Sequence, residues 1–229
     1  MAVGLRRFQV TVKETDLLIL AERDISDRVR NTVITERDRL EHYIAANPGF
    51  RESLVPVESS YAAPQIVRLM IEAGRSAGVG PMAAVAGAIC EMIAADLDDE
   101  ALELIIENGG DCLVKSSIDR TIGIYAGEDD DPPSIGVLVR SQEMPIGVCT
   151  SSGKIGHSLS FGDSAAATVI AGSCALADAA ATAVGNRVRG REGISSGLET
   201  ARSIPGVVGA VVIRNGQMGA WGAVELVRI

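Results

Sequence analysis

The sequence predicts an α+β fold in which a mixed or antiparallel sheet is covered by packed helices. Segments that are typical of strands occur in pairs joined by short turns, as in hairpins, and do not alternate one by one with helices as in a doubly wound sheet. Hydrophobic residues make up 47% of the 229 residues but aromatic residues only 3%. Small and aliphatic side chains must therefore fill the core, which suits close packing of helices on a sheet. We expect one domain over residues 1–229.

The N-terminal part of the chain predicts a hairpin followed by three helices. Alternation of apolar and polar residues begins at Phe8, and a second apolar run lies within 16–22, as expected for two strands joined by a short turn. The following segments have apolar residues at helical spacing, and the charged face of the first helix is expected to be solvated. The predicted helices are 25–46, 62–77 and 82–96, and the third is apolar on nearly every side, so it should lie in the interior.

The remainder of the chain predicts further hairpins and two more helices. Asn108-Gly109-Gly110-Asp111 separates two apolar runs as a tight turn does, and Asn215-Gly216 does the same near the C-terminus. We assign the charged, proline-broken segment 128–133 to a solvent-exposed loop. The predicted strands are 104–107, 112–115, 121–125, 135–140, 146–149, 167–171, 207–214 and a final strand toward Val227, and the predicted helices are 174–188 and 195–204.

The charge balance argues against two classes of partner, nucleic acid and acidic membrane surfaces. The net charge is −9 at pH 7 and no basic stripe occurs, which argues against binding to nucleic acid or to an acidic membrane surface. An anionic nucleotide would need a local source of positive potential, such as a metal ion, a helix N-terminus or exposed backbone amides. The sequence leaves a homo-oligomer open.

The cysteines and the apolar segments indicate where in the cell the protein is expected. The four cysteines are scattered without a disulfide or zinc spacing, so we expect buried, reduced thiols. No apolar signal segment precedes the first strand, and a cytoplasmic location is expected. The apolar stretches 82–95 and 165–184 carry Glu91 and Asp178, and we interpret them as parts of the core and not as membrane spans.

The turn Asn108-Gly109-Gly110-Asp111 is the first candidate binding site. Paired glycines let backbone amides approach a phosphate or a nucleobase, and Asp111 can accept hydrogen bonds from a ligand. Most turns of this kind are purely structural, because an Asn-Gly pair is the commonest hairpin signal. The pattern alone therefore leaves both roles open.

Asp178 and Thr182 form the second candidate, a metal site. A spacing of four residues places both side chains on one face of a helix, and both offer the hard oxygen atoms that Mg²⁺ accepts. The alternatives are a threonine hydroxyl bonded back along its own helix and an aspartate that faces water. The apolar surroundings of Asp178 favour ligation, because a carboxylate there needs a cation or hydrogen-bond donors.

The third candidate is the polar, glycine-broken segment that starts at Cys149. Ser151, Ser152 and Lys154 could hold phosphate, and His157 could act as a general acid or base or contact a ligand. A nucleophilic Cys149 or Ser152 paired with His157 is conceivable, but spacing alone does not establish a triad. A loop with one hydrogen-bonded histidine is the simpler interpretation of each residue alone.

Taken in order, these segments resemble the ApbE family of FAD:protein FMN transferases. Leu104-Ile-Ile-Glu-Asn-Gly-Gly-Asp111 resembles that family's strand ending in Gly-Gly-Asp, and Thr150-Ser-Ser-Gly153 resembles its Thr-Ser-Gly segment, with His157 just downstream. Ala177-Asp-Ala-Ala-Ala-Thr-Ala183 is similar to the family's Ala-Asp-Ala-Leu-Ala-Thr-Ala helix, and the apolar strands on either side of it are also in register. The resemblance is collinear over about residues 78–229, which is more specific than any single motif.

The resemblance implies a T-fold-like core that binds FAD or FMN and Mg²⁺ and transfers FMN from FAD to a threonine or serine of an acceptor protein. Asp178 and Thr182 are then the expected metal ligands, and His157 and Asp178 the expected catalytic residues. The residues expected to bind the nucleotide are Asn108, Gly109, Gly110, Asp111, Thr150, Ser151, Ser152 and Gly153.

Three departures from the family pattern keep a second function open. The family continues after its histidine with Ile-Ile-Asp-Pro-x-Thr-Gly, whereas this chain has Ser158-Leu-Ser-Phe-Gly-Asp163. Ala86 stands where the family has a lysine, and residues 1–77 lack the family's flavin-contacting aromatic segments. The first hypothesis is thus a magnesium-dependent flavin or nucleotidyl transferase, and the second is a non-catalytic binding or assembly protein with the same fold.

Overall fold

A large antiparallel sheet forms the middle of the molecule. The computed structural model describes residues 4–58, 62–126, 134–153 and 162–229. Within these ranges eight strands lie side by side in this sheet, and each neighbouring pair is antiparallel. In spatial order they are β1 (Arg6–Val12), β2 (Thr15–Ala21), β3 (Leu104–Asn108), β4 (Asp111–Lys115), β7 (Ile146–Ser151), β8 (Ala166–Ala171), β9 (Val207–Arg214) and β10 (Gln217–Gly222).

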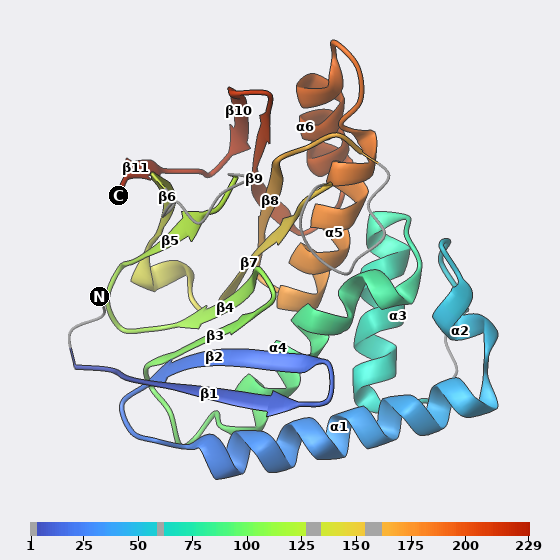
Figure 1. Ribbon diagram of the computed structural model, residues 1–229, viewed down its shortest axis with the longest axis vertical. Helices are drawn as coiled ribbons and strands as arrows, with labels where there is room; N and C mark the ends of the chain where they lie inside the picture. Colours follow the sequence, from blue (N-terminus) through green and yellow to red (C-terminus); the bar gives the residue numbers. More distant parts are fainter. Residues whose placement is uncertain (1–3, 59–61, 127–133, 154–161) are drawn as a thin grey trace.

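Helices cover one face of this sheet. They are α1 (Ser26–Ala46), α2 (Gly49–Glu52), α3 (Gln65–Ala77), α4 (Val85–Asp96), α5 (Cys174–Arg187) and α6 (Gly193–Ser203). In Figure 1, α1 runs along the lower edge of the molecule, and α3, α5 and α6 stand to the right of the sheet. α3 starts directly after Pro64 and ends at Gly78, whose left-handed backbone (φ 71°) allows the chain to leave the helix. The interior position predicted for α4 is confirmed by its contacts with α1, α5, β3 and β4.

A small sheet covers the other face of the large sheet. It consists of β5 (Arg120–Ile124), β6 (Ile135–Val139) and β11 (Leu226–Arg228), which lie to the left in Figure 1. The single final strand that we predicted toward Val227 is wrong, because the chain ends β10 at Gly222 and enters the second sheet as β11. Gly222 has φ 87°, and a Cβ there would lie 2.2 Å from the carbonyl oxygen of Val208, so only glycine fits this crossing.

Two apolar cores separate the three layers. The larger core lies between the helices and the large sheet, and much of it is built from the small side chains of α5, including Ala177, Ala180 and Ala181. The smaller core lies between the two sheets, where Val114 and Val148 of the large sheet join Val137 of β6 in one cluster. The α+β class with antiparallel strands and packed helices is therefore confirmed, as is a core without large aromatic content.

The remaining sequence expectations differ from the structure only locally. The predicted helix 82–96 is a 3₁₀ turn, Pro81–Ala84, followed by α4. The segment 128–133 that we assigned to solvent lies outside the described residues. No single described helix is long and apolar enough to cross a membrane, and only α3 taken together with the Pro81–Asp96 segment, across a bend of 105°, passes a test of length and composition.

A buried ion pair joins the start of β3 to the start of β5. Arg120 Nη2 lies 2.7 Å from Glu103 Oε2, and the two side chains are only 9% and 13% exposed. Ser116 and Ser117 donate further hydrogen bonds to the same carboxylate. Burial alone would raise the pKa of Glu103, but these donors outweigh it and lower the pKa from 4.5 to about 2.

We predict that Glu103→Gln destabilises the protein by about 3 kcal/mol at pH 7, because it leaves the Arg120 charge buried and unpaired. The folded-state pKa lies below the ordinary value, so the stabilisation is complete above pH 4.5 and is lost as the pH falls toward 2. Urea unfolding of the wild type and of Glu103→Gln between pH 7 and pH 3 measures this, and the difference in stability between them should shrink at low pH.

Asp98→Asn is the control: Asp98 is 75% exposed beside Lys115, so its loss should cost less than about 1 kcal/mol of stability. An equal effect of both substitutions at pH 7 would contradict the interpretation.

Candidate functional site

The candidate site is built on a close crossing of α4 and α5. A Cβ at Gly87 of α4 would lie 2.3 Å from the carbonyl oxygen of Cys174 and 2.9 Å from Cβ of Asp178. A Cβ at Gly147 of β7 would lie 2.5 Å from Cα of Cys174 on another side of the same residue. The first turn of α5 is therefore held between two glycines, and no larger residue fits at either position without a backbone shift.

Each of these two helices caps the other. The Gly87 N–H, in the first turn of α4, donates to Asp178 Oδ2 at 2.9 Å. In return, Glu91 Oε2 accepts from the Ala175 N–H and the Ser173 hydroxyl at the start of α5, both at 3.0 Å. These bonds satisfy N–H groups that a helix leaves free at its N-terminus, and they place a carboxylate at the positive end of each helix dipole. Asp178 therefore has a structural role in addition to any ligand role.

A pocket of about 830 Å³ opens beside this crossing. α1 and α2, the start of α4, the β3–β4 turn, the end of β7 and one face of α5 contribute to its wall. The sequence-predicted residues that line it are Asn108, Gly109, Asp111, Thr150, Ser151, Ser152, Asp178 and Thr182. Gly110 and Gly153 are not among the lining residues, and His157 lies outside the described residues. Segments about 40 and 70 residues apart in the sequence thus meet in one pocket.

The backbone conformation of the β3–β4 turn accounts for its two glycines. Gly109 and Gly110 have φ values of 66° and 104°, which suit glycine, and the Gly110 N–H donates to Glu107 at 2.7 Å. The Gly110 carbonyl accepts from the Thr150 N–H of β7 at 3.2 Å, so the turn is joined to the Thr-Ser segment. Asn108 donates from Nδ2 to the Ala86 carbonyl oxygen at 3.2 Å and joins the turn to α4.

A buried carboxylate, Asp111, and a half-buried one, Asp178, share the pocket. Burial and the nearby charge of Asp178 raise the pKa of Asp111 well above its ordinary value. Burial also raises the pKa of Asp178, to about 7, although the backbone N–H groups of Gly87 and Ala86 favour its charged form. Neither side chain has an arginine or lysine partner among the described residues. Such a pair favours protons or a cation, because two neighbouring negative charges repel each other most strongly where water is excluded.

The oxygen atoms in this part of the pocket suit a magnesium ion. Asp111, Asp178 and Thr182 all line it, and their side chains carry the hard oxygen atoms that Mg²⁺ prefers as ligands. No group of three or more His, Cys, Asp or Glu side chains with metal-binding geometry occurs in the described part of the chain. A site here would therefore depend on the two carboxylates together with neutral oxygens, as is usual for magnesium bound beside a phosphate.

A group of charged residues in the wall of the pocket was missed by sequence reasoning. Lys13, Arg37, Glu41 and Arg51 line it, and they come from the β1–β2 turn, α1 and α2. We expected the charged face of α1 to be solvated, which is wrong for Arg37, since its side chain is only 17% exposed and contacts Glu14, Thr15 and Glu41. No local signal in α1 reveals this, because the burial arises from elements that pack beside the helix. Lys13 and Arg37 are themselves ion-paired with Glu41 and Glu14, so this group of lining residues carries charges of both signs.

The cysteines lie beneath this site as buried thiols. Cys90, Cys149 and Cys174 are each at most 1% exposed, and the sulfur atoms of Cys149 and Cys174 are 3.7 Å apart. A hydrogen bond with Cys174 and burial raise the pKa of Cys90 well above its ordinary value, and a hydrogen bond with Cys149 and burial do the same for Cys174. Burial raises the pKa of Cys149 well above its ordinary value. The four cysteines are free, as predicted, and a nucleophilic Cys149 is not supported, because nucleophilic attack needs the thiolate.

Comparison with known proteins identifies the family. A family model described as "AbpE bacteria" matches residues 1–205. The chain belongs to this family. A UPF0280 protein of Methanocaldococcus jannaschii is 41% identical over 227 residues, covering 96% of this chain and 92% of the relative. A UPF0280 protein of Methanococcus maripaludis strain C7 is 40% identical over 222 residues, covering 94% and 90%.

Comparison with solved structures shows that this protein has the ApbE fold. The flavinyl transferase ApbE of Pseudomonas stutzeri, in its apo form, superposes with a TM-score of 0.56 at 14% identity and covers 95% of this chain and 94% of its own. The flavin transferase ApbE of Vibrio cholerae gives a TM-score of 0.57 at 10% identity and covers 95% and 96%. The resemblance seen in the sequence is therefore confirmed at the level of family and fold.

We predict that Gly87→Ala destabilises the protein by about 3 kcal/mol, the upper part of the range for overpacked cores, because the new methyl group meets backbone. A glycine-to-alanine change inside a helix otherwise stabilises by about 1 kcal/mol, so a loss identifies the steric contact. Chemical denaturation of the variant beside Gly172→Ala measures it, because a Cβ at Gly172 meets nothing within 4 Å and should change stability by less than about 0.5 kcal/mol. Stability of Gly87→Ala equal to or above that of the wild type would refute the close crossing.

Proposed function

We propose that the protein is a magnesium-dependent enzyme of flavin-nucleotide chemistry that binds FAD and transfers FMN to a hydroxyl group of an acceptor protein. The observation that carries the proposal is the pairing of Asp111 with Asp178 in a pocket that Thr182 also lines. The ApbE relatives of similar fold are flavin transferases by name, which supports flavin as the nucleotide.

The shape of the pocket supports a nucleotide. Its volume of about 830 Å³ is in the range of pockets that enclose cofactor-sized ligands. Leu40, Ile44 and Met82 offer apolar surface, and the Ser151 and Ser152 segment offers hydroxyl groups. A ligand with an apolar ring system and a diphosphate matches this combination of lining residues.

Asp178 and Thr182 would hold the magnesium ion, with Asp111 as the nearby second carboxylate. The ion, when bound, would supply the positive charge that orients the diphosphate and stabilises charge on the leaving phosphate. The remaining residues position the substrate: the β3–β4 turn with Gly109 presents backbone to the ligand, and Asn108 holds that turn against α4 through the Ala86 carbonyl. A rigid frame of this kind lowers the entropy lost when the reacting groups are aligned.

The proposed transfer exchanges one phosphorus–oxygen bond for another. The acceptor hydroxyl oxygen forms a bond to the phosphorus atom of the FMN half of FAD, and the bond from that phosphorus to the bridging oxygen breaks, so that AMP leaves with the electron pair. The hydroxyl proton passes to a base. His157 remains our prediction for that base, by family resemblance.

A second candidate function is nucleotide binding without catalysis. The observation that favours it is Ala86, which lines the pocket at the position where the ApbE pattern has lysine. Without the lysine charge, the phosphates would be stabilised less in the transition state, whereas binding of the nucleotide in the ground state would be weakened less. A binding or assembly protein would retain the pocket and the ion but not the reaction.

Asp178→Asn tests the proposal, because asparagine keeps an oxygen that can accept from the Gly87 N–H but removes the charge. We predict at least a tenfold loss of FAD affinity in the presence of Mg²⁺, with a folded protein, measured by calorimetric titration. Wild type should bind FAD less tightly in EDTA than in Mg²⁺, and Asp99→Asn, at an exposed position, should behave as wild type. Wild-type affinity in Asp178→Asn, or FAD binding unaffected by EDTA, would contradict the metal site.

Release of AMP from FAD separates the two candidate functions. The transferase predicts slow release of AMP by wild-type protein with Mg²⁺, with water as acceptor, and no release by Asp178→Asn. Chromatography of the nucleotides measures it. Mg²⁺-dependent binding of FAD without AMP release would favour the binding protein instead.

A further inference from the structure

A buried glutamate interrupts the apolar stripe of α1. The residues of α1 that face the core recur at helical spacing, and they are Val29, Val33, Glu36 and Leu40. The side chain of Glu36 is only 6% exposed. A leucine at this position would continue the stripe, so a carboxylate here is a departure from the pattern that stabilises the helix against the core.

One oxygen of this carboxylate has no partner. Arg39 Nη1 donates to Glu36 Oε1 at 2.6 Å, but Oε2 is buried and accepts no hydrogen bond from any residue in the described ranges. A buried carboxylate oxygen without a donor is unfavourable, because it has lost its hydration without compensation. Such an atom indicates a missing donor.

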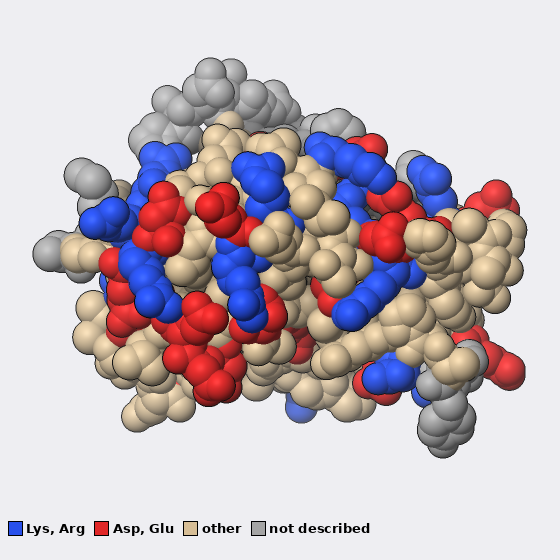
Figure 2. Space-filling view, turned by 90° about the horizontal axis from the view of Figure 1, so that it is seen from below, with Lys and Arg blue, Asp and Glu red and all other residues tan. Residues whose placement is uncertain are grey.

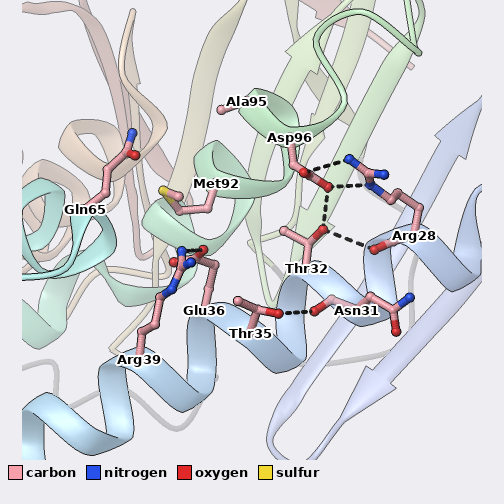
Figure 3. A pocket seen from close by; sticks show the side chains of 10 residues that line it. All are labelled: Arg28, Asn31, Thr32, Thr35, Glu36, Arg39, Gln65, Met92, Ala95 and Asp96. Atoms are coloured by element: carbon pink, nitrogen blue, oxygen red, sulfur yellow. Dashed lines mark hydrogen bonds and ion pairs between the residues drawn. The ribbon is translucent and has the colours of Figure 1, made fainter.

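Glu36 lies in the wall of a second cavity, of about 500 Å³, between α1 and α4. Figure 3 shows Glu36 and Arg39 together beside Met92, with Thr32, Asp96 and Arg28 to their right, and all six line the cavity. This cavity is separate from the proposed flavin pocket, to which α1 contributes Arg37, Leu40 and Glu41 from another side.

The charged side chains of this cavity form two ion pairs, Arg28 with Asp96 and Arg39 with Glu36. Asp96 accepts two hydrogen bonds from Arg28, at 2.8 and 2.9 Å, and a third from the Thr32 hydroxyl at 2.6 Å. The guanidinium groups of Arg28 and Arg39 therefore each face a carboxylate and offer little net attraction to an anion. Glu36 Oε2 is the unpaired acceptor among the charged groups that line the cavity in the described structure.

We propose that this cavity binds a small aliphatic ammonium compound with a single positive charge. The ammonium group donates to Glu36 Oε2, and the aliphatic part packs on Met92 and Ala95. A single charge fits because Asp96, the other lining carboxylate, is saturated by Arg28 and Thr32. Arg39, whose side chain is 53% exposed, covers the carboxylate and can move aside to admit the ligand.

The surface around the cavity favours a small ligand over a highly charged macromolecule. Figure 2 views the molecule from below, the side along which α1 runs in Figure 1, and positive and negative side chains alternate across it. A macromolecule with many like charges finds no extended complementary patch on this face. A small ligand needs only the one acceptor.

Methionine methyl resonances test the proposal, because Met92 lines this cavity and Met82 lines the flavin pocket. Titration of the methyl-labelled protein with n-butylammonium should shift the Met92 signal saturably and leave Met82 unchanged. 1-Butanol, a neutral molecule of the same length, should bind at least tenfold more weakly. An equal response to both ligands, or a shift at Met82 alone, would overturn the ammonium site.

Two variants identify the residue responsible. Glu36→Gln should reduce n-butylammonium affinity at least tenfold, whereas Glu41→Gln, on the same helix but in the other pocket, should not change it. Arg39→Gln should increase the affinity, because it frees Glu36 Oε1, and it provides a gain-of-binding readout if Glu36→Gln fails to fold. Unchanged affinity in Arg39→Gln, or wild-type affinity in folded Glu36→Gln, would refute the proposal.

Discussion

The contact of Cys174 with two glycines is the constraint on which the candidate site depends. Gly87 of α4 and Gly147 of β7 both approach the backbone of Cys174 so closely that neither has space for a methyl group. This brings α4, α5 and the centre of the large sheet into direct contact, with the small side chains of α5 filling the space between. A composition rich in alanine and poor in aromatic residues is thus a requirement of this packing and not only a general feature of the core.

The same crossing creates the conflict that marks the site. Because the helices are so close, Asp178 reaches the first turn of α4 and Glu91 reaches the first turn of α5, and both caps stabilise the pair. Asp178 is at the same time half-buried in a pocket with Asp111, and desolvation raises the pKa values of both carboxylates. Packing favours the position of Asp178 while its electrostatic environment opposes its charge, and such local conflicts are expected where function requires them.

Much of this arrangement could be predicted from the sequence because the signals are local. Alternating apolar residues on either side of Asn108-Gly109-Gly110-Asp111 predicted β3 and β4, and the Asp178–Thr182 spacing predicted two oxygen groups on one helix face, both of which line the pocket. Family resemblance then linked segments that are far apart in the chain, a link that periodicity cannot supply. The catalytic and ligand roles of these residues remain predictions.

The features that escaped prediction depend on tertiary contacts. Arg37 and Glu36 belong to a helix face with many charges, and their burial arises from the β1–β2 turn and from the packing of α4, which the local pattern of α1 does not encode. The division of the last strand at Gly222 depends likewise on the approach of Val208. The cap that Glu91 provides joins residues more than 80 positions apart. In each case the same residue could be buried or exposed, and the element that packs beside it in the fold decides which.

The most direct test of the account is the position of a divalent cation in crystals of the protein grown with MnCl₂ and FAD. Manganese takes the same hard oxygen ligands as magnesium and is identified by its anomalous scattering. The account predicts an anomalous peak in contact with Asp178 and Thr182, next to the diphosphate of the bound nucleotide. A nucleotide bound in the pocket without a peak at these residues, or a peak only at surface carboxylates, would contradict it.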